Sequence, residues 1–558
     1  MPTFDRFLRY DELTAELQAM AAEHPDLLQV ESIGRSHEGR ALWLATVTDR
    51  ATGPHDTKPA QWVDANIHAT EVTGSVAALH LLHHLVTGFG ADENVTRALR
   101  TRTFYVVPRV NPDGAELALA DRPRLLRSSV RRWPWQDGHV PPGLDEGDVD
   151  GDGRILTMRI PDPHGAWRSH PDEPRLLTRR RPDEPGGEGC YRLLREGWLR
   201  DHDGFTIPTP RTQEGLDLNR NFPAGWGQEV PGPGDYPGSE PEILALMAAV
   251  IARPNVCGYN AYHTSGGVLL RPSSTRPDRE LPPVDVRMWT QLGRRCTELT
   301  TYPVHSIFED FTWDPSKVMS GAADDWAYEH LGVYSWTTEY WDVVAAATDQ
   351  RSHTDIWVTG PTPEQELAVL RWADEHHPGE MFVEWQPFDH PQLGPIELGG
   401  WDWLHSWTNP PSGRLQAEVA PHAEFAVFQA LAAPALEVLL ADAEPLGEGT
   451  WRVRAGIANT GWLPTTVTER ARANALVLPA VVELTGPAGL EVLDPPARRE
   501  VGQLAGRSEL ELRSDRTNDG TADRALVTWT VRAPAGTEVV IEARHQRAGR
   551  AQRALRLS

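Results

Sequence analysis

Residues 66–74 read "NIHATEVTG" and place a histidine, His68, three positions before a glutamate, Glu71. The segment follows the alternating apolar run "AQWVDANI", which predicts a strand, and it leads into a helical pattern. Imidazole nitrogens and carboxylate oxygens suit Zn²⁺, and a catalytic zinc site has three protein ligands and one position for water. The chain contains 21 His and 79 Asp or Glu residues, so such a pair also arises by chance. Two interpretations stay open, part of a metal site or a helix-capping glutamate beside an unrelated histidine.

A second histidine stands where another strand should end. In "VCGYNAYHTSGGVLL" an apolar run reaches His263 and is followed by small, turn-forming residues. Because ligands of α/β domains gather beyond the carboxyl ends of the strands, His263 is the candidate for a third metal ligand. Taken alone, it also fits a buried histidine within a strand.

Two other segments carry groups that could act on a substrate. The Gly-flanked stretch "GLDLNRNFPAGWG" contains Asn219 and Arg220, which could bind a carboxylate or could be an ordinary solvated loop. The stretch "GVYSWTTEYWD" holds Glu339 among apolar residues in a strand-like pattern. An isolated buried carboxylate is costly, so Glu339 is expected to be either paired or a working base.

Strand and helix patterns that could position these groups alternate through about residue 375 and predict an α/β domain with a buried central sheet, residues 1–375. Within it, residues 138–215 are rich in Gly, Pro, Asp and Arg and are expected to form a long, loop-dominated insertion. Residues 376–435 are expected to be an extension that packs on this domain. Short apolar runs between turn signals in residues 436–558 predict an all-β sandwich.

Composition excludes several classes of partner. The net charge of −25 argues against nucleic acid or an anionic membrane, and no run approaches the length of a membrane helix. The first residues are charged and amphipathic, unlike a signal peptide. Three cysteines without a CxxC pair predict free thiols in a reducing compartment, and hence a cytoplasmic protein: Cys190, Cys257 and Cys296. Nothing in the sequence indicates an oligomeric state.

Taken in order, the motifs resemble those of the zinc carboxypeptidase family that includes pancreatic carboxypeptidases A and B. The shared pattern consists of HxxE, "NPDG" at 111–114, "DLNRN" at 217–221, a lone His, and a late strand ending at Glu339. The resemblance covers about residues 5–350, and it implies a mixed central sheet flanked by helices. It also implies one Zn²⁺ per chain held by His68, Glu71 and His263, with Glu339 as the general base.

The resemblance assigns roles to other residues as well. It implies that Asn219 and Arg220 clamp the terminal carboxylate of a substrate, so the enzyme would act on peptide or protein C-termini. Arg127, in "PRLLRSSV", matches the family's oxyanion-stabilising arginine, and Arg131 is the fallback. Asp324 stands before the "DW" of the late segment, where the family lines the pocket for the last side chain. A carboxylate there implies a preference for C-terminal Lys, Arg or another amino-bearing residue, unless Asp324 caps a helix or pairs with an Arg.

The chain departs from the family pattern at two positions. Thr70 stands where many members have an Arg between the paired ligands, and Lys317 stands where the family has a Tyr over the bound C-terminus. Tyr328 is an alternative source of that hydroxyl group. Two other functions also stay open: an amino-acid deacylase of the same superfamily, and a peptide-binding pseudoenzyme without catalysis. Retention of all three ligands and Glu339 speaks against the pseudoenzyme.

An aspartate-rich stretch, "DEGDVDGDGRILTMR", lies outside the family pattern. Asp148, Asp150 and Asp152 match the first half of a calcium-binding loop. The twelfth position is Arg159, where such loops have a bidentate Glu. A structural Ca²⁺ and an ordinary Asp-Gly turn are the two interpretations.

Overall fold

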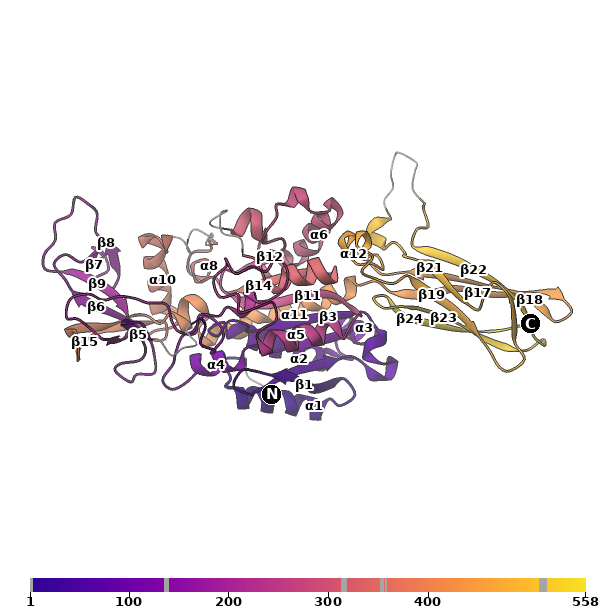
Figure 1. Ribbon diagram of the computed structural model, residues 1–558, viewed down its shortest axis with the longest axis horizontal. Helices are drawn as coiled ribbons and strands as arrows, with labels where there is room; N and C mark the ends of the chain where they lie inside the picture. Colours follow the sequence, from indigo (N-terminus) through magenta and orange to yellow (C-terminus); the bar gives the residue numbers. More distant parts are fainter. Residues whose placement is uncertain (1–3, 135–139, 313–318, 352–355, 357–358, 511–518) are drawn as a thin grey trace.

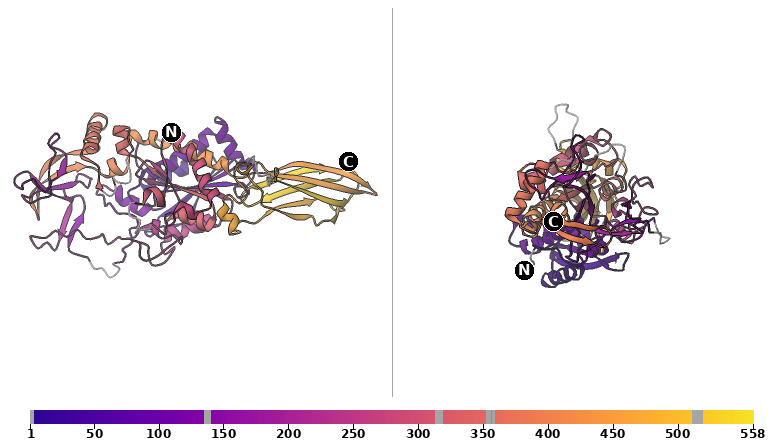
Figure 2. Two further views of the ribbon diagram at one scale, coloured as in Figure 1. Left: turned by 90° about the horizontal axis from the view of Figure 1, so that it is seen from above. Right: turned by 90° about the vertical axis from the view of Figure 1, so that its left-hand side faces the viewer.

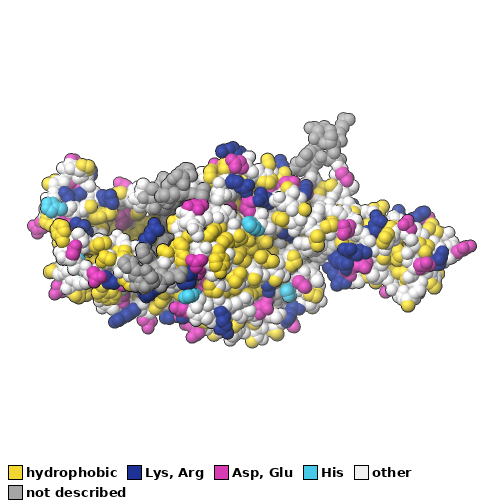
Figure 3. Space-filling model, viewed as in Figure 1, with side chains coloured by type: hydrophobic (Ala, Val, Ile, Leu, Met, Phe, Trp, Pro, Cys, Tyr) yellow, Lys and Arg dark blue, Asp and Glu magenta, His cyan; other side chains and the backbone are white. Residues whose placement is uncertain are grey.

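The structure is a computed structural model that describes residues 4–134, 140–312, 319–351, 356, 359–510 and 519–558. The molecule is elongated, with a central α/β domain between two outlying β-structures (Figures 1 and 2). The sandwich with the C-terminus lies at one end, and strands β6–β9 lie at the other. On the face shown in Figure 3, acidic and basic side chains are interspersed and do not gather in one patch.

The central sheet is mixed and has eight strands in the order β1-β2-β4-β3-β11-β14-β12-β13. Its four middle strands are parallel, and the outer strands include antiparallel pairs. The strands span Leu28–Arg35, Ala41–Val47, Thr103–Val107, Ala60–Ala65, Val256–Thr264, Tyr334–Tyr340, Val268–Arg271 and Val304–Ser306, in sheet order. This sheet confirms the predicted mixed α/β fold.

Helices cover both faces of the sheet because its buried strands are apolar on both sides. Alternate residues of a strand point to opposite faces, and here they enter separate cores. Val63 and Val106 pack in one core and Trp62 and Tyr105 in the other. The first core includes α1 (Tyr10–Glu23), α2 (Thr73–Gly88) and α11 (Leu415–Ala432), and the second includes α5 (Pro241–Ile251).

The predicted insertion is loop-dominated in its described residues, but residues 143–200 also contain six short strands that the sequence did not predict. Four of them join two strands from the extension in a six-stranded sheet of order β15-β16-β6-β9-β7-β8. These strands are only three to nine residues long, and β6 pairs with β16 through Met158 and Leu398, 240 residues apart. The bounds are Gly143–Glu146, Thr157–Pro161, Trp167–Ser169, Leu177–Arg179, Cys190–Arg195 and Gly197–Arg200 for β5–β10, and Phe382–His390 and Gly394–Trp401 for β15 and β16.

The C-terminal region is the predicted β-sandwich. It consists of two four-stranded antiparallel sheets, ordered β17-β18-β22-β20 and β21-β19-β23-β24. Their inner side chains, including Trp451, Trp529 and Ile541, form one buried core. The strands β17–β24 span Leu436–Gly447, Thr450–Asn459, Ala480–Thr485, Glu491–Asp494, Arg498–Gly502, Arg524–Arg532, Glu538–His545 and Gly549–Arg556.

A buried aspartate joins the sandwich to the α/β domain. Asp285, on α6 (Pro283–Thr300), accepts hydrogen bonds from the hydroxyl groups of Tyr328 and Tyr334 at 2.8 and 3.0 Å. It also accepts from the amides of Glu469 and Arg470, at the start of α12 (Glu469–Ala473), at 2.8 and 3.0 Å. The sandwich is therefore bonded to the domain through a fully buried carboxylate.

Two further features bear on the predictions from composition. All three cysteines are buried and free of disulfide bonds: Cys190, Cys257 and Cys296. In the described ranges, no helix combines the length and apolar character needed to cross a membrane.

Candidate active site

The predicted metal ligands meet at one edge of the central sheet. His68 and Glu71 lie in the segment 66–72, between the end of β3 and the start of α2, and His263 is the penultimate residue of β11. Because β3 and β11 are parallel neighbours, their carboxyl ends lie at the same edge. Strand β14 pairs with the other side of β11, in a register that sets Glu339 opposite His263.

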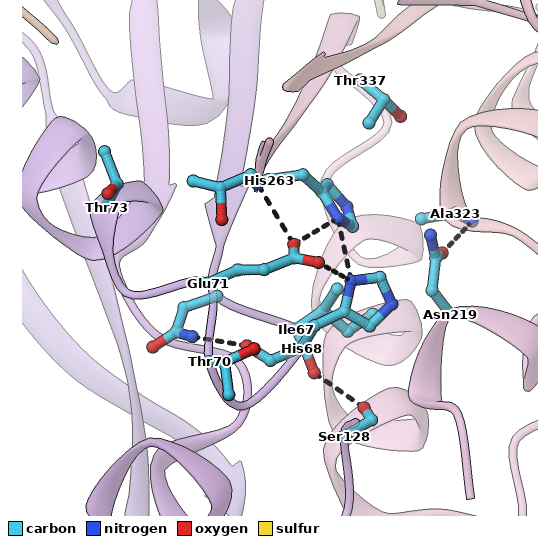
Figure 4. Close-up of polar contacts among 12 residues, drawn as sticks. Ile67, His68, Thr70, Glu71, Thr73, Ser128, Asn219, His263, Ala323 and Thr337 are labelled. Atoms are coloured by element: carbon cyan, nitrogen blue, oxygen red, sulfur yellow. Dashed lines mark hydrogen bonds and ion pairs between the residues drawn. The ribbon is translucent and has the colours of Figure 1, made fainter. Parts of the chain in front are cut away.

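The three ligand groups are close together and buried. His68 Nδ1 lies 2.7 Å from Glu71 Oε1, and His263 Nδ1 lies 2.9 Å from Glu71 Oε2 (Figure 4). The two Nδ1 atoms are 3.2 Å apart, and each side chain offers one ligand atom within 4.8 Å of the others. Two ring nitrogens and a carboxylate that face one another fit the ligand set of a catalytic Zn²⁺.

A residue that sequence analysis did not single out orients one of these ligands. Asp217 Oδ1 lies 3.1 Å from His68 Nε2, so a proton on Nε2 leaves the lone pair on Nδ1 for a metal. Burial acts to raise the pKa of Asp217, but Arg127 and His68 outweigh it and hold that pKa well below its usual value. The available signal was an acidic residue in the same short motif as Asn219 and Arg220.

The two glutamates of the site have opposite electrostatic environments. Burial acts to raise the pKa of Glu71, but the nearby His68 and His263 lower it and keep the carboxylate ionised. Burial raises the pKa of Glu339 to about 8, with the Glu71 carboxylate adding to the increase against the effect of His263. Within the described residues, Glu339 Oε2 has no hydrogen-bond partner. A carboxyl group of this kind can exchange protons near neutral pH.

One cavity of about 220 Å³ unites the predicted groups. Its polar lining includes all eight of the zinc, catalytic and substrate-binding residues predicted from sequence: His68, Glu71, Arg127, Asn219, Arg220, His263, Asp324 and Glu339. One stretch of its wall is apolar and includes Leu270, Ile307, Phe311, Met319 and Ala322.

The structure distinguishes the two candidates for the oxyanion-stabilising arginine, Arg127 and Arg131. Arg127 lies at the ligands, where Nη1 is 3.2 Å from Glu71 Oε1 and Nε is 3.1 Å from Asp217 Oδ2. Arg131 instead forms an ion pair with Glu240 at 2.7 Å and does not line the cavity. The geometry therefore favours Arg127 over the fallback.

The predicted clamp for a carboxylate faces the same cavity. Asn219 Oδ1 accepts a hydrogen bond from the amide of Ala323 at 2.9 Å, which fixes the side chain. Arg220 forms no ion pair with any carboxylate side chain in the described part of the molecule. Its guanidinium group lines the cavity and donates from Nη1 to the carbonyl oxygen of Asn219 at 2.7 Å.

Asp324 lies within the short helix α7 (Ala323–Trp326) and is 2% exposed. Its carboxylate accepts hydrogen bonds from Thr337 Oγ1 at 3.2 Å and from the amide of Asp325 at 2.9 Å. Burial raises its pKa. No arginine pairs with Asp324 among the described residues, and the N-cap position of α7 is occupied by Ala322.

Tyr328, the alternative source of the family's capping hydroxyl group, does not line the cavity. Tyr328 is fully buried, and its hydroxyl group donates to Asp285 at 2.8 Å. Lys317 lies outside the described residues. Thr70 places no charge between the paired ligands.

The aspartate-rich stretch forms a turn. Asp148 accepts hydrogen bonds from the amides of Gly151 and Gly153, and Asp152 accepts one from the amide of Arg154. Asp148 and Asp150 come within 4.8 Å of the buried Glu196, a group that does not include Asp152. Arg159 pairs with Glu397 at 2.8 Å. Calcium binding at this turn stays a prediction without support.

The mixed central sheet and the converging histidine and glutamate ligands agree with the family found by comparison. A family model described as zinc carboxypeptidase matches residues 13–348, and the chain belongs to this family. A second model, described as a domain of unknown function, matches residues 435–556.

Curated relatives match only parts of the chain. Carboxypeptidase B of Astacus astacus is 29% identical over 164 residues, which cover 29% of this chain and 45% of that protein. A zinc carboxypeptidase of Saccharothrix mutabilis subsp. capreolus is 27% identical over 124 residues, 22% of this chain and 27% of that protein. The chain thus spans less than half the length of these relatives. A crystal structure of thrombin activatable fibrinolysis inhibitor aligns over 76% of this chain and 74% of its own, with a TM-score of 0.42 and 17% identity.

Proposed function

We propose that this protein is a zinc-dependent carboxypeptidase that removes the C-terminal residue of peptides. The observation that carries the proposal is the convergence on one cavity of three metal ligands, a carboxyl group of raised pKa and Arg220, which forms no ion pair among the described residues. Each group alone has a structural explanation. Together they supply the parts that amide hydrolysis at a free C-terminus needs.

His68, Glu71 and His263 would hold the Zn²⁺, with Asp217 fixing the tautomer of His68. When bound, zinc lowers the pKa of water and polarises a carbonyl group. Glu339 would accept the proton of the attacking water and return it to the leaving amine, a role that its raised pKa of about 8 suits. Arg127 would stabilise the negative charge that develops on the carbonyl oxygen.

The substrate would be held at its last residue. Arg220, assisted by Asn219, would pair with the terminal carboxylate through charge-assisted hydrogen bonds. Asp324 would receive a positively charged side chain, while the apolar wall with Leu270 and Ile307 covers its methylene groups. The proposed substrates are therefore peptides that end in Lys, Arg or another amino-bearing residue.

The proposed division of the chain assigns catalysis to residues 1–375, support to residues 376–435 and a non-catalytic role to residues 436–558. Every described residue that lines the cavity precedes residue 340. The extension and the sandwich would act through packing on the catalytic domain, as α11 does in the first core and the amides of Glu469 and Arg470 do at Asp285.

A peptide series that differs only in its last residue tests the proposal. We expect release of C-terminal Lys or Arg from free acids, no release from C-terminal amides, and about one zinc per purified chain. Equal cleavage of amides would contradict the carboxylate clamp. Hydrolysis of N-acyl amino acids without peptide cleavage would indicate the deacylase, and protein without zinc or hydrolysis would indicate the pseudoenzyme.

A further inference from the structure

The segment that carries two of the three zinc ligands has no regular secondary structure of its own. It runs from Asn66 to Val72, between β3 and α2. Partners outside the segment must therefore fix its backbone. On one side, Ser128 Oγ donates to Ile67 O at 2.9 Å (Figure 4). The amide of Ala69 donates to the carbonyl oxygen of Arg127 at 3.1 Å.

On the other side, Asn409 of the extension holds the segment. Its Nδ2 donates to the carbonyl oxygen of Thr70 at 2.8 Å and to that of Leu404 at 2.9 Å. Its Oδ1 accepts from the amide and the hydroxyl group of Thr73 at 3.0 and 2.8 Å. The Asn409 side chain is completely buried, and its partners Thr73 and Leu404 are buried while Thr70 is half-buried. Asn409 thus bonds the backbone on both sides of Glu71.

Asn409 also replaces a missing helix cap. The first amides of an α-helix have no acceptor within the helix and are usually capped by the preceding side chain. The residue before α2 is Val72, which has no acceptor, and Asn409 supplies one to Thr73 from 336 residues away. Without it, the buried amide of Thr73 would lose this acceptor, which is unfavourable, and the carbonyl oxygen of Thr70 would lose its donor. The junction that carries Glu71 would then relax into other positions.

We propose that Asn409 is a positioning residue for the zinc ligands, and that it acts by holding the backbone on either side of Glu71. This inference rests on the proposed function of the site. Asn409 lies in the extension, beyond residue 348, where the family match ends. The extension would therefore support metal ligands that belong to the family domain. Asn409 does not touch the ligand atoms, so its effect is on their placement.

The same extension holds the strand that carries Glu339. The indole Nε1 of Trp341 donates to the carbonyl oxygen of Ser406 at 2.6 Å, and the amide of Trp341 donates to Glu418 Oε1 at 3.1 Å. Trp341 directly follows β14 and lies two residues after Glu339. One short part of the extension therefore reaches both the ligand segment and the end of the catalytic strand.

The chain offers a matched control for testing this role. Asn459, in the sandwich, is also completely buried and also makes four hydrogen bonds, in this case all to backbone groups. Its Oδ1 accepts from the amides of Ala435 and Gly461, and its Nδ2 donates to the carbonyl oxygens of Leu463 and Ala505. Asn409→Leu and Asn459→Leu thus remove equivalent hydrogen bonds, but only the first removes them beside the site.

The experiment measures zinc retention by the full-length protein against a competing chelator, with the melting temperature recorded for each variant. We expect Asn409→Leu to weaken zinc binding by about 10-fold to 100-fold, the range for residues that orient metal ligands. It should also change the visible spectrum of the cobalt(II)-substituted protein, which reports ligand geometry. Asn459→Leu should lower the melting temperature but leave zinc retention and the cobalt spectrum unchanged. Equal zinc loss in both variants would overturn the inference.

Thr73→Val provides a milder second test, because it removes only the hydroxyl group that donates to Asn409. We expect a severalfold loss of zinc retention with the protein still folded. Wild-type retention in this variant and in Asn409→Leu would refute the positioning role, and if Asn409→Leu does not fold, wild-type retention in Thr73→Val alone refutes it. A wild-type protein that retains zinc but does not cleave peptides would refute the proposed function and still allow this test.

Discussion

Replacing Asp324 by Asn tests the proposed specificity most directly, because it removes one charge and preserves the shape of the side chain. Asp324 is 2% exposed, lines the cavity and has no ion-pair partner among the described residues. An incoming Lys or Arg would therefore be its direct counter-charge. Truncating one partner of a buried, hydrogen-bonded charge pair costs about 2–5 kcal/mol. This range corresponds to a loss of about 30-fold to several thousand-fold in kcat/KM for basic C-termini.

The same substitution should have the opposite effect on kcat/KM for peptides with apolar C-termini. In the wild type, an apolar side chain would leave the buried carboxylate without a counter-charge, which is unfavourable. Asp324→Asn removes that penalty, so kcat/KM for peptides ending in Leu or Phe should stay equal or rise. The assay compares both peptide classes on the same enzyme preparation, which cancels differences in active fraction. A wild type that prefers Phe or Leu to Arg, or a variant with an unchanged ratio, would refute the reasoning. Asp324→Ala should likewise weaken the preference for basic C-terminal residues or reverse it in favour of apolar ones.

Three other substitutions separate the roles within the site. Glu339→Gln should retain zinc and lose about 10²-fold to 10⁴-fold or more in kcat, because an amide cannot accept the proton; near-wild-type hydrolysis with full zinc would contradict the base assignment. Arg220→Ala should raise KM strongly for free acids, and unchanged kinetics on free C-termini would remove Arg220 from the clamp. Asp217→Asn should weaken zinc binding by about 10-fold to 100-fold, because an amide no longer selects the tautomer of His68. Chelator competition measures this last effect, and wild-type zinc affinity would argue against it.

The parts of the site that could be predicted from sequence are those that lie at strand ends. His68, His263 and Glu339 each follow or complete an apolar strand pattern, and parallel strands bring their carboxyl ends to one edge. The assignment of His263 as the third metal ligand depended on the order of several weak motifs along the chain. The structure adds the strand order β3-β11-β14, which places His263 between the other two elements.

The parts that could not be predicted depend on contacts between distant segments. Strand β6 is recognisable only with its partner β16, because a five-residue strand between turns has no distinctive periodicity. Asn409 gives no local signal, since an Asn before two prolines is an ordinary loop sequence. The role of Asp217 was hidden for a different reason. The motif shows that a carboxylate is present, but only the fold shows that it faces the Nε2 atom of His68.

The wall of the cavity also connects the site to the sandwich. Helix α7 carries Asp324, and Tyr328 and Glu329 follow on the next turn of the same helical segment. Tyr328 donates to Asp285, which accepts from the start of α12, and Glu329 forms ion pairs with Arg276 and Arg470. The segment bearing the proposed specificity residue is thus bonded at its far end to the C-terminal region. Because the free energy of a buried charge pair depends on its geometry, a rigid wall favours the close contact that a basic side chain would need. No described residue of the sandwich lines the cavity, but the sandwich holds the helix that does.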